Sequence, residues 1–237
     1  MYDDENYNES LRKVKRNRLI LKADKTRFSN MFITINIIMF VTASFYAYLS
    51  GVSYFDVLDV LGMKVNQKIL DGEYWRFFAP IILHGGVLHV AFNSIAINAL
   101  SIVERIFGNA KYLIIYIIAG FTGSLASFIF SSAPSVGASG AVFGLLGSLL
   151  YFGLEKPDVF KKYFGSRVIT LVLINIFIGE TMPGIDNYAH MGGLLGGFLA
   201  AGVVSVDEGF EKKEKRILFA GALLLAIVIG LYYGFNN

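Results

Sequence analysis

Ser139, His89 and His190 are the residues whose types and surroundings could do chemistry in this chain. Ser139 lies between Gly137 and Gly140, and His190 is followed closely by further glycines. A serine hydroxyl is a weak nucleophile until a base such as a histidine removes its proton. The sequence has three histidines and no cysteine, which excludes thiolate catalysis, disulfides and Cys-based metal sites. The chemistry that these residues suggest is therefore attack by an activated serine.

The elements that would position these residues are apolar helices long enough to cross a membrane. Of the 237 residues, 55% are hydrophobic and only 16% are charged, and the mean hydropathy is +0.57. Soluble domains carry about 25% charged residues, and a membrane span needs roughly 20 mostly apolar residues. We therefore predict an all-α membrane protein with seven spans. The predicted segments are Met31–Ser50, Val87–Val103, Tyr112–Phe130, Ala138–Gly153, Val168–Ile178, Tyr188–Val204 and Ile217–Phe235.

The distribution of charge divides the chain into a basic tail at 1–30, a six-span core at 31–204 and a connection with a seventh span at 205–237. Lys and Arg gather in the tail and after the second, fourth and sixth spans. Because cytoplasmic connections carry the excess of Lys and Arg, we expect a cytoplasmic N-terminus and an outside C-terminus, with the bacterial plasma membrane as the default location. The aromatic-rich connection at 51–86 is expected to form a structured loop in the outer interface.

Two rows of small residues predict which spans meet. The rows, each at spacing four, are Gly140, Gly144 and Ser148 in the fourth span and Ala189, Gly193, Gly197 and Ala201 in the sixth. Small residues let helix backbones approach closely in membranes. Ser139 adjoins the first row and His190 adjoins the second, so contact between the rows would bring these two side chains toward hydrogen-bonding range.

His89 and Asn93 lie four residues apart at the start of the second span, hence on one helix face. Donors at this depth could stabilise an oxyanion beside Ser139. The alternative for Asn93 is a hydrogen bond that holds neighbouring helices together. Apart from Glu180 and Asp186, in or near the last outside loop, no acidic residue is expected inside the membrane near the outer span ends, so we predict a catalytic dyad.

At these positions the sequence resembles the rhomboid family of intramembrane serine proteases, from about Glu73 to Val204. The agreement is specific because five motifs occur in order at the family's spacing, whereas a lone Gly-x-Ser-Gly occurs by chance. The motifs are Glu73-Tyr74-Trp75-Arg76, His84…His89…Asn93, Glu104-Arg105, Gly137-Ala138-Ser139-Gly140 and Gly184…Ala189-His190-Met191-Gly192-Gly193…Gly197. The resemblance implies a six-helix rhomboid-like core, and the seventh helix resembles an arrangement found in part of the family.

The resemblance also implies a serine endopeptidase that hydrolyses peptide bonds in or near transmembrane helices. Ser139 would be the nucleophile, and His190 would be the general base and then the general acid. The oxyanion hole would be formed by His89, Asn93 and the Ser139 backbone N–H.

Further positions have supporting roles by the same resemblance. Gly137 and Ala138 would shape the loop of the oxyanion hole, and Phe143 would pack on the catalytic histidine. Structural or supporting roles are implied for Trp75, Arg76, His84, Glu104, Gly140, Gly193 and Gly197.

The partners implied are single-span or multi-span membrane proteins as substrates and the lipid bilayer, with no cofactor and no metal. The net charge of +3 is too small to indicate nucleic acid. An inactive relative that binds transmembrane helices is one alternative, although such relatives typically lack the serine or the histidine. A transporter would be expected to show inverted repeats or half-helices. A metalloprotease would need His-Glu-x-x-His or a similar ligand set, and an aspartyl protease would need two aspartates within spans. None of these patterns is evident in the sequence. The substrate and the oligomeric state are left open.

Overall fold

The computed structural model describes residues 21–23, 25–181, 184–206 and 213–236, and most of the predicted basic tail lies outside them. Regular structure in the described residues is helical, apart from one isolated antiparallel bridge between Lys64 and Ser135. The elements are α2 (Arg27–Ser50), α3 (Tyr54–Val60), α4 (Asn66–Leu70), η1 (Tyr74–Phe77), η2 (Ala79–Ile82), α5 (Val87–Ala99), α6 (Ile102–Phe107), α7 (Asn109–Phe130), α8 (Ser139–Glu155), α9 (Pro157–Tyr163), α10 (Ser166–Thr181), α11 (Asn187–Val204) and α12 (Lys213–Asn236).

Each of the seven predicted segments contains a helix, and the all-α class is confirmed. Four helical stretches are long and apolar enough to cross a membrane: α2, α5 with α6, α7 and α12. The pair α9 and α10, bent by 72°, would be a fifth if it forms one span. The apolar helix α8 is shorter, with 17 residues. The count of seven spans therefore stays a prediction.

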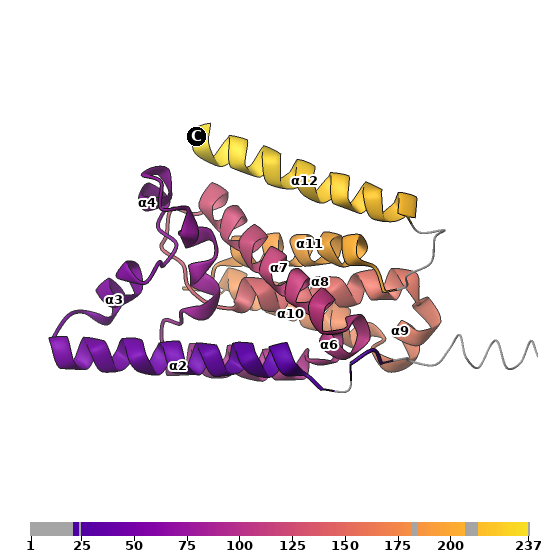
Figure 1. Cartoon of the computed structure of the whole chain (residues 1–237), viewed down its shortest axis with the longest axis horizontal. Coiled ribbons are helices and arrows are strands. Elements are labelled where there is room, and N and C mark those ends of the chain that lie inside the picture. The colour runs from indigo at the N-terminus through magenta and orange to yellow at the C-terminus, as the bar shows by residue number, and fades with distance from the viewer. Residues whose placement is uncertain (1–20, 24, 182–183, 207–212, 237) are drawn as a thin grey trace, which may run out of the picture.

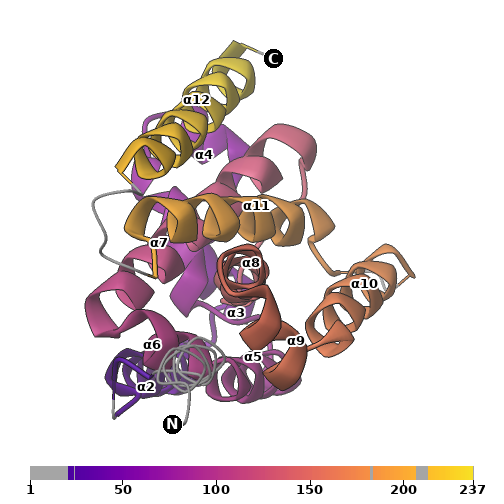
Figure 2. The same cartoon turned by 90° about the vertical axis from the view of Figure 1, so that its right-hand side faces the viewer.

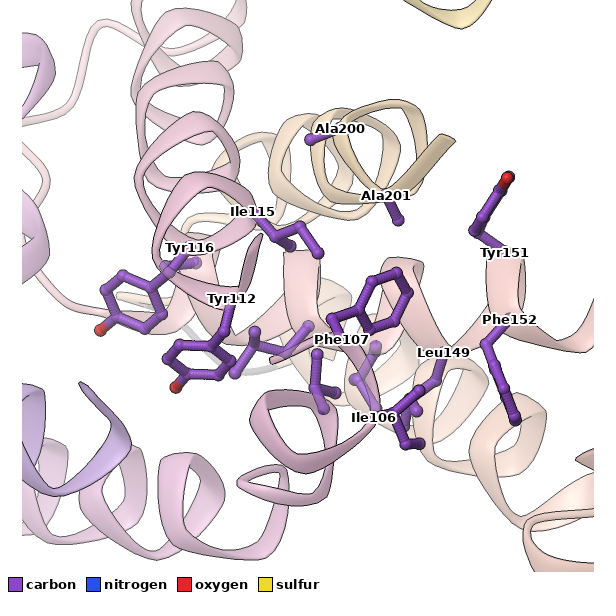
Figure 3. Packing of buried hydrophobic residues seen from close by; sticks show 14 of the residues in the cluster. Ile106, Phe107, Tyr112, Ile115, Tyr116, Leu149, Tyr151, Phe152, Ala200 and Ala201 are labelled. Carbon is purple, nitrogen blue, oxygen red and sulfur yellow. The ribbon is translucent and has the colours of Figure 1, made fainter. Parts of the chain in front are cut away.

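Helix α8 runs through the middle of the bundle, with α7, α11, α5 and α10 around it (Figure 2). The helices α2 and α12 lie on opposite outer sides (Figure 1). Large buried side chains of α6, α7 and α8 form one cluster (Figure 3), namely Ile106, Phe107, Tyr112, Ile115, Tyr116, Leu149, Tyr151 and Phe152, which pack near Ala200 and Ala201 of α11. Closer to Ser139, glycines of α8 and α11 bring the two helix backbones into contact.

Local backbone chemistry sets where α8 and α11 begin. Gly137 has φ +129°, a conformation that side chains disfavour, and its N–H donates to the Pro80 carbonyl over 2.9 Å. The chain turns there and α8 starts two residues later. Helix α11 starts after Asp186, whose carboxylate accepts a hydrogen bond from the Ala189 N–H at 3.0 Å, as an N-cap residue does.

The connection at 51–86 is folded, as predicted, and consists of α3, α4, η1 and η2. Buried Arg76 holds it together by donating to Glu73 at 2.7 Å, to Asp59 at 3.2 Å and to the Met63 carbonyl at 2.6 Å. These bonds satisfy most of the guanidinium donors, so the charge is buried with partners. The structural role expected of Arg76 stays a prediction.

The opposite end of the bundle is joined by buried Glu104. Its carboxylate accepts from the Phe28 N–H at 2.8 Å, the Ser29 N–H at 2.9 Å and the Ser29 hydroxyl at 2.7 Å. These are groups of the first turn of α2, whose N–H groups have no partner within the helix. Glu104 therefore caps a helix far away in sequence.

Candidate functional site

The small-residue rows of α8 and α11 are in backbone contact, as the sequence predicted. A Cβ added to Gly193 would collide with the Gly140 carbonyl, and one added to Gly197 would collide with the Gly144 backbone. A Cβ on Gly140 would lie 3.3 Å from the Ala189 carbonyl oxygen. Larger side chains at these positions would force the helices apart.

This contact brings His190 onto the face of α8 that carries Ser139. The His190 ring stacks on Phe143, with ring centroids 4.1 Å apart and an interplanar angle of 10°. Phe143 follows Ser139 by four residues, so both side chains lie on one face of α8. The imidazole therefore lies against the same face of α8 as Ser139, about one helical turn further along the helix. The packing of Phe143 on His190 is as expected.

His190 is buried and its Nδ1 atom has no hydrogen-bond partner among the described residues, whereas Ser139 is half-buried. In serine hydrolases with a triad, a carboxylate accepts a hydrogen bond from the Nδ1 of the histidine. The nearby Asp186 carboxylate is instead engaged by the Ala189 N–H and the Ser127 hydroxyl. Within the described part of the chain, no carboxylate is hydrogen-bonded to the His190 Nδ1 atom.

His89 and Asn93 reach the turn that precedes Ser139. A Cβ added to Gly137 would lie 2.5 Å from the His89 Nε2 atom and 3.7 Å from the Asn93 Nδ2 atom. Three segments therefore meet at one end of the bundle: the start of α5, the loop before α8 and the start of α11. The first N–H groups of α8 have no acceptor within the helix and add donors there.

The hydrogen bonds of this pair are local. Asn93 Nδ2 donates to the His89 carbonyl at 3.2 Å, within α5, and His89 Nδ1 accepts from the Gly85 N–H at 3.4 Å. An amide group has a second N–H, so this bond leaves Asn93 one further donor. His84 lies behind the pair, buried, with its ring 5.1 Å from the His89 ring. Burial lowers the pKa of His84 to about 3, so it is neutral at physiological pH.

Of the remaining predicted positions, Trp75 lies away from this cluster, whereas Ala138 lies in it, between Gly137 and Ser139. Trp75 is about half exposed and lies against Gly62, where an added Cβ would be 3.2 Å from its ring. Ala138 is fully buried at the N-cap of α8. Neither residue touches the Phe143–His190 stack in any contact described for them.

Lys64 is a residue that the sequence analysis missed. Its backbone forms a two-way bridge with Ser135, and its ammonium group donates to the carbonyls of Ser131 at 2.7 Å and Ala133 at 2.9 Å. Lys64 thus holds the loop that leads into Gly137 against the connection at 51–86. Burial lowers the pKa of Lys64 to about 8, and nearby Asp186 opposes that shift. A lysine between a methionine and a valine gives no sequence signal of this role.

Two glycines of the close-packed region were also missed. A Cβ on Gly147 would collide with the Leu194 carbonyl, and one on Gly123 of α7 would lie 2.8 Å from the Ala189 carbonyl oxygen. Gly147 lies outside the row at spacing four, and Gly123 shows that α7 joins the contact. The spacing of the glycines in each segment was the only signal that could have found them.

The fold and this cluster define a class: a helical integral membrane protein with a serine and a histidine gathered at one end of the bundle. Residues 71–207, more than half of the chain, match the Rhomboid domain. The chain belongs to the rhomboid family.

Sequence similarity to several rhomboid proteins supports this membership. The chain is 40% identical over 220 residues to Rhomboid protease GluP of Bacillus subtilis, covering 92% of this chain and 42% of that protein. It is 34% identical over 203 residues to RHOMBOID-like protein 4 of Arabidopsis thaliana (74% and 50%) and 40% identical over 141 residues to RHOMBOID-like protein 1 (58% and 36%). The chain thus spans half or less of the length of these relatives.

Proposed function

We propose that this chain is an intramembrane serine endopeptidase that uses a Ser139–His190 dyad to hydrolyse peptide bonds in or near transmembrane helices. The observation that carries the proposal is the stacking of His190 on Phe143, one turn along α8 from Ser139. Membership of a family that includes a named rhomboid protease supports the reaction type.

The reaction follows from the arrangement of these groups. His190 takes the proton of the Ser139 hydroxyl as Ser139 Oγ attacks the scissile carbonyl carbon, and the carbonyl oxygen becomes an oxyanion. His190 then gives the proton to the leaving amine, and an acyl-enzyme remains. Water deprotonated by His190 attacks the acyl group and releases Ser139. Phe143 holds the imidazole plane during both proton transfers.

The oxyanion would be stabilised by donors on two segments. The free N–H groups at the start of α8 form the positive end of the helix dipole. His89 and Asn93 lie on the other side of the turn at Gly137 and would add side-chain donors. Donors fixed in advance need no reorganisation as charge develops, which is why their position matters more than their number.

The substrates are membrane proteins, with one span or several. A helix in lipid hides its peptide bonds in internal hydrogen bonds, so we expect cleavage near helix-weakening residues. The distribution of Lys and Arg supports a cytoplasmic N-terminus and a site facing the outside. The bacterial plasma membrane is the default location.

The test is cleavage of a reporter transmembrane substrate in liposomes by the wild-type chain, Ser139→Ala and His190→Ala. Cleavage by the wild type and by neither variant is expected. Cleavage that survives Ser139→Ala would remove Ser139 as the nucleophile. A folded wild-type protein that binds several substrates and cleaves none would instead indicate a helix-binding relative without activity.

A further inference from the structure

Helix α12 is attached to the rest of the bundle at both of its ends. At its start, Lys215 pairs with Glu155, Arg216 donates to the Val203 carbonyl at 2.9 Å, and Phe219 packs in the notch left by Gly202. At its end, the Phe235 ring lies 5.3 Å from the Phe128 ring and 5.8 Å from the Tyr74 ring. The position of α12 is thus set from two separate points.

Between these two attachments, α12 leaves a cavity of about 470 Å³ against α7 and α11. The helix passes over the crossing of α7 and α11 at an angle (Figure 1). That crossing is closely packed, because Cβ atoms on Gly192 and Gly196 would collide with Ala126 and Thr122. Gly192 and Gly196 carry no side chain that could fill the space toward α12. Beside this space α12 does touch α7, because a Cβ added to Gly230 would lie 3.0 Å from Leu125.

The lining of the cavity excludes water and polar ligands. Its side chains are apolar except for Thr122 and Tyr233. The Thr122 hydroxyl already donates to the Ile118 carbonyl of its own helix at 3.0 Å. A water molecule needs two to four polar partners to occupy a cavity, and apolar cavities stay dry. The occupant must therefore be apolar.

The size of the cavity excludes a transmembrane helix. A helix with side chains is about 10 Å across, so this volume would hold roughly one turn of it. A single flexible hydrocarbon chain fits, because it can follow the gap between α12 and the α7–α11 pair. In a bilayer, such chains surround every outer helix, and α12 is exposed on its other faces.

The cavity lies in the half of the membrane that holds Ser139 and His190. It is lined by Phe130 at the end of α7, by Gly192 near the start of α11 and by Tyr233 near the end of α12. The Phe130 ring lies 5.5 Å from the ring of Tyr188, two residues before His190. A lipid that enters the cavity would therefore come from the leaflet on that side.

We propose that this cavity binds one acyl chain of a phospholipid from the leaflet at the Ser139 end. The bound chain fills the gap that the two attachments of α12 leave open, and it makes the phospholipid a component of the folded protein. The site is independent of the proposed dyad, since it lies between α7, α11 and α12 and its occupant makes no contact with Ser139.

The first experiment measures retained lipid on the full chain. Wild type, Ala226→Phe and Ala220→Phe are reconstituted in vesicles of palmitoyl-oleoyl phosphatidylglycerol and phosphatidylethanolamine, extracted in mild detergent and examined by native mass spectrometry. Ala226 lines the cavity and Ala220 does not, and both are exposed residues of the same helix, so Ala220→Phe is the matched control. We expect one firmly held phospholipid on wild type and Ala220→Phe, and about tenfold less on Ala226→Phe.

A second experiment uses only the wild type, so that misfolding of a variant cannot decide the result. A phospholipid with a photoreactive group near the end of its acyl chain is bound in vesicles, the protein is extracted, and light is applied afterwards. Adducts are expected on cavity residues such as Leu125, Leu195 and Ile229. Equal retention by Ala226→Phe and wild type, adducts confined to outward-facing Leu224 and Leu225, or a retained mass of a free fatty acid would each overturn the proposal.

Discussion

Gly137→Ala is the substitution that tests the oxyanion site most directly. Gly137 has φ +129°, and an added Cβ would lie 2.5 Å from His89 Nε2 and 3.7 Å from Asn93 Nδ2. The first contact is shorter than any real Cβ makes, so either His89 or the turn before Ser139 must shift. The methyl group would also occupy the space in which His89 and Asn93 would reach the proposed oxyanion.

The substitution has two separable effects. A side chain at a positive φ costs roughly 1–3 kcal/mol of folding free energy. Loss of one well-placed oxyanion donor costs roughly 10²–10³ in kcat. We therefore expect a modest fall in stability and a much larger fall in cleavage rate.

Gly72→Ala is the matched control, because Gly72 has φ +100° and an added Cβ there meets nothing within 4 Å. It carries the backbone penalty without touching the site. Thermal unfolding and the rate of reporter cleavage in liposomes are measured for both variants. Gly137→Ala that cleaves as fast as Gly72→Ala would refute the assignment of an oxyanion site beside Gly137.

Three further predictions concern other parts of the structure. Asn93→Ala should lower kcat without abolishing cleavage, because the α8 N–H donors remain; normal cleavage by this variant would take Asn93 out of the site. The pKa of Lys64, lowered by burial from 10.5 to about 8, means that the unfolded chain binds more protons above pH 8. The free energy of unfolding of wild type should therefore rise by roughly 2–3 kcal/mol relative to Lys64→Met between pH 7 and pH 10, and parallel pH profiles in denaturation titrations would contradict this. Glu104→Gln should lower stability by roughly 3 kcal/mol, since an amide nitrogen cannot accept the hydrogen bonds of Ser29; an unchanged unfolding midpoint would show that the cap contributes little.

The sequence alone determined where the helices are and which two of them meet. Long apolar runs give the helices because backbone groups in lipid must be paired internally. The glycine rows predicted the contact of α8 with α11, since small residues at spacing four let two helix backbones approach closely. The placement of His190 against the Phe143 face of α8 follows from that contact.

Other features were decided by the tertiary structure. The bend between α9 and α10, the capping of α2 by Glu104 and the position of Lys64 each depend on groups distant in sequence. Local periodicity carries no information on such pairs. The cavity beside α12 is of the same kind, because it lies between α7, α11 and α12 and no single segment encodes it. Shape complementarity between distant segments, unlike hydropathy, exists only once the helices have packed.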